Sequence, residues 1–404
     1  MIDLRAARND PERFRAAVAR KGASDAFDEL LAADARWREL VPQVDELRAR
    51  QKVSGRPTPA QVEELKRVKE DLRGLEEELD AADAARNELL LRVPNPPHES
   101  VPDGDSEEDA VEVRRVGEPP DLTDPKGHLE LGRFDMDRAA RISGSRFGYF
   151  VGDVARIAFA LYRLALDRLV ASGFTPVLPP VLVRDVAMYG TGWFPTEEHN
   201  IYAVTGDDLY LVGTSEVPVG GLHLQEILEA EELPVRYVAF STCFRREAGA
   251  AGKDTRGMFR VHQFNKVEQF VLCRPDESWD EHERLLANTE AIVQTLGLPY
   301  RVVTLPAGDI SAASAKTYDV ELWFSSQERY RETASISNTT DYQTRRLQIR
   351  YRGAKGLEPV HTLNGTAAVD RMVLALLETY QREDGSVEVP TSLVELGAPS
   401  IASA

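Results

Sequence analysis

Two long apolar repeats separated by a short turn-rich segment constrain the fold of this chain more than any other feature. Their apolar residues alternate spacings of three and four, which is typical of two helices wound around each other. The segment between them, SGRPTPAQ, contains a glycine and two prolines, and Thr58, Pro59 and Gln61 have the spacing of a helix capping box. We therefore predict an antiparallel helical hairpin over about residues 27–92, with arms of about 40 Å at 1.5 Å per residue. The repeats are Leu30, Ala33, Trp37, Leu40, Val44 and Leu47, and Leu65, Val68, Leu72, Leu75, Leu79, Ala82 and Leu89.

The residues before and within the first repeat carry helix signals of their own. Residues 1–23 predict one helix, with Asp10 as N-cap, Pro11 at the first helical position and Gly22 at its end. Pro42 lies inside the first repeat, where a proline removes a hydrogen bond and crowds the preceding turn. We expect Pro42 to kink or interrupt that helix.

A domain boundary is predicted after the hairpin. From Pro94 to about Pro120 the chain is rich in proline and acidic residues and has no periodicity, which indicates a linker. The predicted organisation is an N-terminal domain at 1–100, a linker at 101–126 and a second domain at 127–404.

The second domain mixes one strong helix with many short strands. Residues 152–171 carry an apolar stripe at helical spacing. Few regular strand–helix–strand alternations occur, so we predict an α+β fold with a mostly antiparallel sheet flanked by helices. The clearest strand candidates are VRYVAF (235–240), KVEQFVLC (266–273), YRVVTL (300–305), YDVELWF (318–324) and TRRLQIRY (344–351).

The overall charge argues against a nucleic-acid partner, whereas the local charge at the hairpin tip favours one. The chain has 49 basic and 67 acidic residues, a net charge of -18. Between residues 48 and 69, however, seven basic residues face only two acidic ones. Such a tip indicates a contact with a polyanion, and a solvated helix face with uneven charge is the alternative. The tip cations considered for this contact are Arg48, Arg50, Lys52 and Arg56.

Cysteine content and hydropathy set the expected compartment. Cys243 and Cys273 are the two cysteines of the chain, and no Cys-x-x-Cys or His/Cys cluster indicates zinc. No stretch of eighteen apolar residues occurs, and the first residues do not have the pattern of a signal peptide. We expect a soluble, cytoplasmic protein with reduced thiols.

The stretch CFRREAGAAGKDTRGMFRVHQFNKVEQF (243–270) predicts two paired strands around a glycine-rich loop. If 241–247 and 260–270 pair, one face presents Arg245 and Glu247 on one strand. The partner strand adds Arg260, Phe264 and Glu268 at even spacing. An arginine fork suits a phosphate, a flat ring suits a nucleobase, and carboxylates suit an amine. A solvated hairpin with charges on its wet face is the alternative.

This stretch, with FRRE before the loop and RVHQF after it, resembles motif 2 of the class II aminoacyl-tRNA synthetases, and other segments narrow the resemblance to the seryl-tRNA synthetase family. GTSEVPVGGLH is similar to the Thr-x-Glu amino-acid-binding element of that family, and YRETASISNTTDYQTRRLQIRY is similar to its Glu-x-x-Ser-x-Ser-Asn segment. HTLNGTAAVDRMVLALLETYQ resembles motif 3, and the segment 144–180 resembles motif 1, which forms the dimer. The helical hairpin matches the tRNA-binding arm, so the resemblance spans nearly the whole chain.

The resemblance implies a class II synthetase fold and a role for each matching residue. Arg245 should hold the ATP α-phosphate, Glu247 the adenine amino edge, Phe264 the adenine ring, and Arg371 the γ-phosphate. Glu332 and Ser335 should bind Mg²⁺ with ATP, and Arg245, Glu332 and Arg371 form the implied catalytic set. The implied serine pocket is Thr214, Glu216, Arg245, Glu268, Asn364 and Thr366. The implied tRNA contacts are Arg48, Arg50, Lys52 and Arg56 on the arm, and Lys253 and Arg256 at the tip of the motif 2 loop.

Plainer interpretations of single residues stay open at this point. Glu332 could form a salt bridge with Arg345 or Arg346, Thr366 could be a turn residue after Gly365, and Phe264 could belong to the core.

Three hypotheses for the function follow. The first is a serine–tRNA ligase that uses ATP to form seryl-adenylate and transfers serine to the 3′ end of tRNA, as a homodimer. The second is a paralogue that forms seryl-adenylate for a specialised biosynthetic or resistance role. The third is an RNA-binding paralogue without activity. The basic arm favours the first over the second, and the full set of ATP and serine residues disfavours the third.

Overall fold

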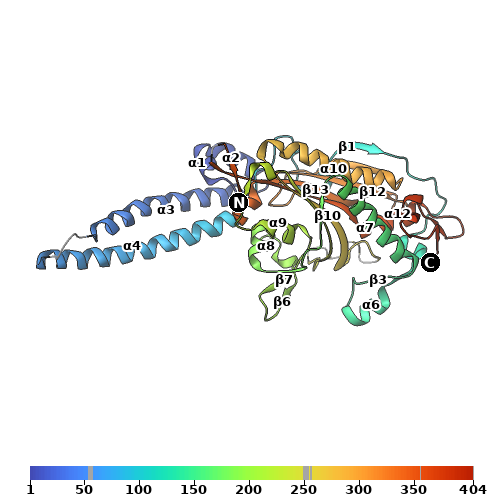
Figure 1. Ribbon diagram of the computed structural model, residues 1–404, viewed down its shortest axis with the longest axis horizontal. Helices are drawn as coiled ribbons and strands as arrows, with labels where there is room; N and C mark the ends of the chain where they lie inside the picture. Colours follow the sequence, from blue (N-terminus) through green and yellow to red (C-terminus); the bar gives the residue numbers. More distant parts are fainter. Residues whose placement is uncertain (53–57, 249–253, 255–256, 355, 404) are drawn as a thin grey trace. The chain divides into compact units, whose positions relative to one another are not determined.

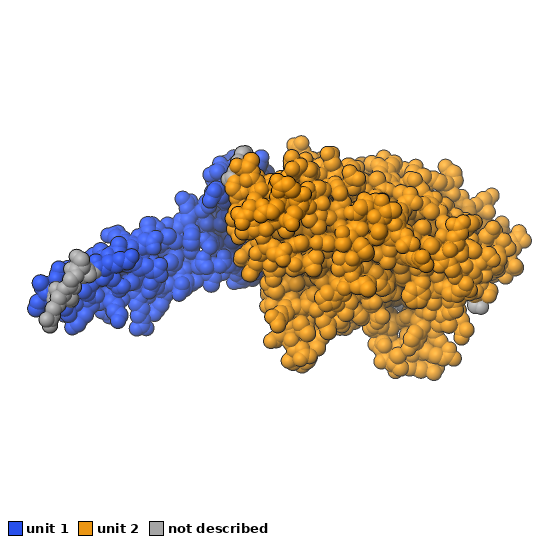
Figure 2. Space-filling model, viewed as in Figure 1, with its two compact units in different colours: residues 1–96 blue, residues 97–404 orange. Residues whose placement is uncertain are grey.

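The computed structural model describes residues 1–52, 58–248, 254, 257–354 and 356–403. Arg56, Lys253 and Arg256, three of the predicted tRNA contacts, lie outside these residues. The chain divides into two compact units, Met1–Pro96 and Pro97–Ala404 (Figure 2). Each unit has its own hydrophobic core.

The first unit begins with two short helices where we predicted one. Helix α1 covers Leu4–Asn9 and helix α2 covers Pro11–Ala19. Asp10 separates them because its backbone leaves the helical region and its side chain accepts the Arg13 N–H at 3.3 Å. The N-cap at Asp10 is confirmed, and a single helix over residues 1–23 is wrong.

The predicted hairpin is present as helix α3 (Ser24–Arg50) and helix α4 (Pro59–Arg92), which run antiparallel (Figure 1). Arg36 reaches Glu78 at 2.7 Å, and Arg48 reaches Glu76 at 2.8 Å, so the two helices lie side by side. The capping box at Thr58 forms with Gln61 as predicted. Helix α3 passes through Pro42 without interruption, because packing along the rest of the helix outweighs the one missing hydrogen bond.

A large sheet forms the centre of the second unit. Among the described residues, eight of its strands are ordered β1-β11-β12-β13-β16-β10-β9-β4, and each neighbouring pair is antiparallel except β4 with β9. This confirms the predicted α+β class. The strands are β1 (Val111–Val116), β4 (Thr175–Val177), β9 (Val235–Phe244), β10 (Gln263–Cys273), β11 (Tyr300–Thr304), β12 (Lys316–Phe324), β13 (Arg329–Thr340) and β16 (His361–Val369).

Three long helices pack against this sheet and bury its largest apolar cluster (Figure 1). They are α7 (Asp153–Ala171), α10 (Ser278–Thr295) and α12 (Asp370–Thr379). Alternation along β10 separates the two faces of the sheet: Gln269 donates to the Leu285 carbonyl of α10 at 3.2 Å, and Glu268 points away from α10. The face opposite α10 is therefore open to a site.

Two predicted segments differ in the structure. TRRLQIRY was predicted as a strand, but Tyr342–Leu347 forms helix α11 and only Arg350–Gly353 forms a strand, β14. The segment 101–126, predicted as a linker, contains the exposed edge strand β1. Smaller elements complete the unit: α5 (His128–Leu131), α6 (Met136–Ser143), α8 (Asp185–Thr191), α9 (Glu216–Gly220), α13 (Thr391–Val394), β2 (Phe134–Asp135), β3 (Tyr149–Phe150), β5 (Leu182–Val183), β6 (Ala203–Val204), β7 (Leu209–Leu211), β8 (Ile227–Glu229), β15 (Gly356–Pro359), β17 (Val387–Glu388) and β18 (Ile401–Ala402).

Candidate active site

A cavity of about 430 Å³ lies on the sheet face opposite α10. Strands β10, β13 and β16 contribute to its floor, Arg245 lines it just after β9 ends, and helix α12 begins at its edge. Every residue predicted for ATP or serine binding lines this cavity, although these residues come from six separate stretches of the chain. They are Thr214, Glu216, Arg245, Glu247, Phe264, Glu268, Glu332, Ser335, Asn364, Thr366 and Arg371.

At one end of the cavity, two neutral amide side chains donate hydrogen bonds to a carboxylate. The Glu216 Oε1 atom accepts from Gln343 Nε2 at 2.6 Å and from Asn364 Nδ2 at 2.9 Å. Burial, together with the nearby charge of Glu268, raises the pKa of Glu216 to about 7. Glu216 is thus a carboxylate that a cationic ligand would stabilise in its charged form.

A buried lysine contacts two residues of the predicted serine pocket. Lys266 Nζ lies 2.6 Å from Glu268 Oε2 and 2.7 Å from Thr214 Oγ1, and the side chains of both charged residues are under one-tenth exposed. Thr366 Oγ1 adds a longer contact of 3.4 Å to Glu268 Oε2. Two carboxylates share one ammonium, so this end of the cavity carries an excess of negative charge when Glu216 is ionised.

Arg245 lies just beyond the end of β9, between two aromatic rings. Its guanidinium carbon is 5.4 Å from the ring centroids of both Trp193 and Phe264, and its Nε donates to the Gly213 carbonyl at 3.1 Å. His262 holds the backbone here, since its Nδ1 lies 2.9 Å from the Arg245 carbonyl oxygen. The guanidinium therefore has a fixed position inside the cavity.

Glu247 and Arg260 were predicted to lie on two paired strands, and the structure differs. Both residues lie outside the paired strands, because β9 ends at Phe244 and β10 starts at Gln263. They still meet across the hairpin, with Arg260 Nη1 2.7 Å from Glu247 Oε2. Phe264 and Glu268 share the cavity face of β10 as predicted.

Arg371, in the first turn of α12, closes the opposite end of the cavity. Its Nε donates to the Phe259 carbonyl at 3.0 Å, and its Nη1 donates to Glu332 Oε2 at 2.8 Å. Burial acts to raise the pKa of Glu332, but the charge and hydrogen bond of Arg371 outweigh it and the pKa is lowered. The alternative partners for Glu332, Arg345 and Arg346, are engaged elsewhere, with Asp341 and with Tyr342.

A second carboxylate lies beside Glu332 and Ser335. Asp319 pairs with Ser335 in the strand register, is 6 % exposed, and has one side-chain oxygen without a hydrogen-bond partner. Burial and the charge of Glu332 raise its pKa well above the usual range for an aspartate. Two carboxylates and a hydroxyl suit a hard divalent cation, so these residues fit Mg²⁺. No group of three or more His, Cys, Asp or Glu side chains with metal-site geometry occurs in the described part of the chain.

Asp370 precedes Arg371, so a buried acidic residue lies next to the arginine that is expected to bind the γ-phosphate. The Asp370 carboxylate accepts hydrogen bonds from the Tyr162 hydroxyl and, at 3.0 Å, from the Asn265 N–H. Burial raises its pKa to about 6. Asp370 thus joins α7 and β10 to the start of α12, and its negative charge is held by these donors.

Several residues of the site were missed from the sequence. Lys266 could have been found, because positions 264, 266 and 268 alternate onto one strand face. Trp193, Gln343 and Asp319 come from distant segments and carry no local signal.

The predicted arm contacts lie in the first unit. Arg48 and Arg50 form exposed ion pairs with Glu76 and Glu64, which reduces the net positive charge that the tip presents. Lys52 is exposed. No helix of the described residues is long and apolar enough to cross a membrane.

Comparisons with known proteins fit both units. The Seryl-tRNA synthetase N-terminal domain profile matches residues 1–97, and the tRNA synthetase class II core domain (G, H, P, S and T) profile matches residues 200–380. A serine–tRNA ligase of Acidothermus cellulolyticus is 46% identical over 408 residues, covering 97% of each chain. The chain belongs to the seryl-tRNA synthetase family.

Solved structures of this family are similar along the full length. Seryl-tRNA synthetase from Pyrococcus horikoshii, solved with ATP, has a TM-score of 0.93 at 38% identity, covering 100% of this chain and 99% of the other. The cytoplasmic serine–tRNA ligase from Naegleria fowleri, solved with AMP, has a TM-score of 0.88 at 33% identity, covering 98% and 96%. The N-terminal coiled-coil arm and the class II core are therefore shared with members of the seryl-tRNA synthetase family.

Proposed function

We infer that this protein is a serine–tRNA ligase, which activates L-serine with ATP and transfers it to tRNA. The observation that carries this conclusion is the convergence of all eleven predicted ATP and serine residues on one cavity, in a chain of this family. The proposed place of action is the cytoplasm.

The nucleotide is proposed to lie between Arg245 and Arg371. Arg245 supplies a fixed guanidinium for the α-phosphate, where charge develops during attack, and Phe264 supplies the ring on which adenine stacks. Glu247, held by Arg260, meets the adenine amino group. Arg371 reaches the γ-phosphate from the start of α12.

Serine is proposed to bind at the end of the cavity that holds the two carboxylates. Its ammonium is attracted by Glu216 and Glu268, and its carboxylate is oriented by Arg245 toward the α-phosphorus. Thr214, Asn364 and Thr366 provide small polar groups for the substrate. In-line attack by the serine carboxylate on the α-phosphorus releases pyrophosphate, and a terminal ribose hydroxyl of tRNA then attacks the activated carbonyl and displaces AMP.

Magnesium is proposed to be held by Glu332 and Ser335, with Asp319 beside them. When bound, the ion supplies positive charge to the triphosphate. In the structure, the Glu332 carboxylate contacts Arg371. The residue proposed to bind Mg²⁺ is therefore in direct contact with the residue proposed to bind the γ-phosphate.

Transfer RNA is proposed to contact the arm through Arg48, Arg50, Lys52 and Arg56, and the motif 2 loop through Lys253 and Arg256. A long basic-tipped hairpin suits recognition of RNA shape and backbone. Because Arg256 is proposed to contact tRNA, R256A should slow transfer to tRNA more than it slows adenylate formation.

A homodimer is proposed through the motif 1 segment. Phe159 on α7 is 71 % exposed and Leu178 after β4 is 83 % exposed, which is unusual for large apolar side chains on adjacent elements. Light scattering of wild type and of F159D/L178D tests this: the variant should shift from dimer to monomer.

The test of the proposed function is charging of a bulk tRNA preparation with labelled serine, run beside serine-dependent ATP–pyrophosphate exchange. Exchange with charging supports the ligase. Exchange without charging supports the alternative, a paralogue that forms seryl-adenylate for another acceptor. Threonine and alanine, which differ from serine by one group each, are the controls.

A further inference from the structure

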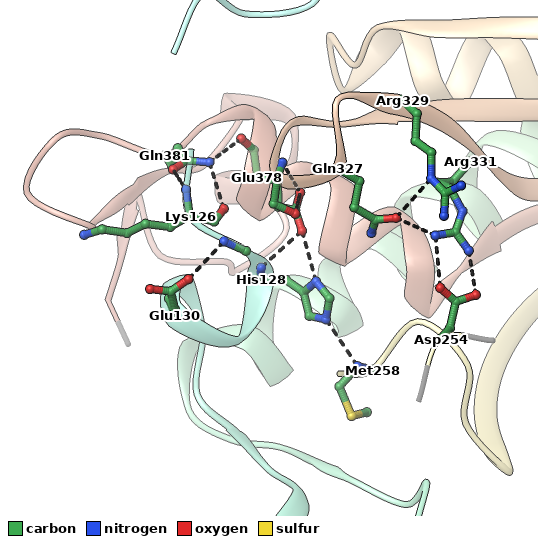
Figure 3. A network of polar contacts seen from close by, with 12 residues as sticks. Lys126, His128, Glu130, Asp254, Met258, Gln327, Arg329, Arg331, Glu378 and Gln381 are labelled. Carbon is green, nitrogen blue, oxygen red and sulfur yellow. Dashed lines mark hydrogen bonds and ion pairs between the residues drawn. The ribbon is translucent and has the colours of Figure 1, made fainter. Parts of the chain in front are cut away.

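The far end of the motif 2 loop is fixed by a buried histidine outside the predicted site. His128 begins helix α5 and is 8 % exposed, and its Nδ1 lies 3.0 Å from Glu378 Oε1 (Figure 3). Its Nε2 lies 3.2 Å from the backbone N–H of Met258. Met258 lines the cavity.

The partners of Glu378 determine which nitrogen of His128 carries the proton. Glu378 is fully buried, and its oxygens also accept from the His128 N–H at 3.1 Å, the Ser326 N–H at 3.0 Å and the Ser326 hydroxyl at 2.8 Å. The carboxylate is thus an acceptor throughout, so Nδ1 of His128 must donate. Nε2 is then free to accept the Met258 N–H, and only this neutral tautomer satisfies both contacts.

The ring also abuts the loop backbone directly. Gly257 has a φ of +83°, and a Cβ atom there would lie 2.8 Å from His128 Nε2. The backbone at 257–258 therefore has no space to shift toward α5.

This contact is one residue away from the carbonyl that holds Arg371. Phe259 accepts the Arg371 Nε at 3.0 Å, and the Arg371 guanidinium lies over the Phe259 ring at 4.5 Å. Arg371 and Glu378 are both on α12, seven residues or about 10 Å apart along one helix face. Residues 258 and 259 are therefore attached to α12 twice: directly through Arg371, and through His128 and Glu378.

We propose that His128 is a positioning residue for the triphosphate end of the nucleotide, acting through Met258 and Phe259 on Arg371. This rests on the proposed role of Arg371 at the γ-phosphate. If the backbone at 258–259 is released, the Phe259 carbonyl no longer fixes the guanidinium. ATP should then bind more weakly, and AMP, which has no γ-phosphate, should be little affected.

The experiment measures the dissociation constants of MgATP and AMP by titration calorimetry in the absence of any amino acid. H128N keeps an amide N–H near the Nδ1 position but removes the acceptor for Met258. H128Q places an amide oxygen near the Nε2 position. We expect H128N to weaken ATP binding about tenfold, the effect of one buried unsatisfied donor, AMP binding to change less than about threefold, and H128Q to lie between H128N and wild type.

A matched control is available on the same unit. His223 also bridges a carboxylate and a second partner, with Nδ1 2.7 Å from Glu226 and Nε2 2.8 Å from the Tyr237 hydroxyl, but neither partner lines the cavity, whereas Met258 does. H223N should leave both affinities unchanged. In an R371A background, H128N should have no further effect on ATP, because the two residues act in one chain of contacts.

Equal weakening of ATP and AMP by H128N, or a full effect of H128N in the R371A background, would overturn the proposal. If H128N does not fold, the affinities for ATP and AMP are compared in E378Q instead. This variant places an amide where the Glu378 carboxylate accepts four hydrogen bonds. A wild-type protein that binds no ATP would instead contradict the proposed function, and the two failures are therefore distinguishable.

Discussion

Replacing Lys266 by methionine should strongly destabilise the second unit, because the ammonium is the one cation in direct contact with Glu268 among the described residues. Methionine keeps much of the length of the lysine chain and removes its charge. The substitution leaves the carboxylate of Glu268, 2 % exposed, without its ion-pair partner, and the hydroxyl of Thr214 without its 2.7 Å donor. Breaking a buried pair by removing one partner costs about 3–5 kcal/mol.

Urea denaturation followed by tryptophan fluorescence measures this decrease in stability, since Trp193, Trp279 and Trp323 all belong to the second unit. The matched control is K316M: Lys316 is half-buried at the start of β12 and lies 4.5 Å from the Tyr318 ring centroid, a contact worth about 1 kcal/mol. The double variant K266M/E268Q should recover much of the stability, because it leaves no unpaired charge. A decrease below about 1 kcal/mol for K266M, or no recovery in the double variant, would show that Lys266 does not stabilise a buried charge on Glu268.

Three further predictions follow from the site and the arm. The pKa of Glu216 is raised from 4.5 to about 7, so the folded state favours its neutral form, and the stability of wild type relative to E216Q should fall by about 2.5 kcal/mol as pH rises from 5 to 8. An equal dependence of stability on pH for the two proteins in urea unfolding would count against this. E332Q should weaken Mn²⁺ binding, measured by electron paramagnetic resonance without substrates, about tenfold or more, and an unchanged affinity would remove Glu332 from the metal site. R50A/K52A should weaken the salt dependence of tRNA binding: the slope of log affinity against log salt concentration should fall by about one for each phosphate that the arm no longer neutralises. Pyrophosphate exchange should stay unchanged. A decrease in exchange would show that the arm is not an independent tRNA-binding element.

The predictable part of the fold came from periodic segments and capping residues. The heptad repeats predicted α3 and α4, and Thr58 with Gln61 predicted where α4 starts, because these signals are local. Pro42 was expected to disturb α3, yet one local penalty did not outweigh packing along 27 residues. The strand predicted over 344–351 failed because alternating apolar residues at Leu347, Ile349 and Tyr351 span a helix end and a short strand.

The candidate site was predictable where a motif places residues on one strand, and not where tertiary contacts complete it. Phe264 and Glu268 follow from alternation along β10, and the same alternation places Lys266 beside them. Gln343, Asp319 and His128 each contact a residue that lines the cavity, and no local sequence signal indicated these tertiary contacts. The roles assigned to the site residues stay predictions until substitutions test them.

ATP–pyrophosphate exchange, measured separately with each of the twenty amino acids, is the most direct test of serine activation by this protein. Exchange requires the amino acid, ATP and the metal to meet in the one cavity, and it does not depend on the arm or on tRNA. Strong exchange with serine and little with threonine, alanine or glycine is the predicted result. Exchange with another amino acid, or with none, would contradict the assignment of Thr214, Glu216, Glu268, Asn364 and Thr366 to a serine pocket.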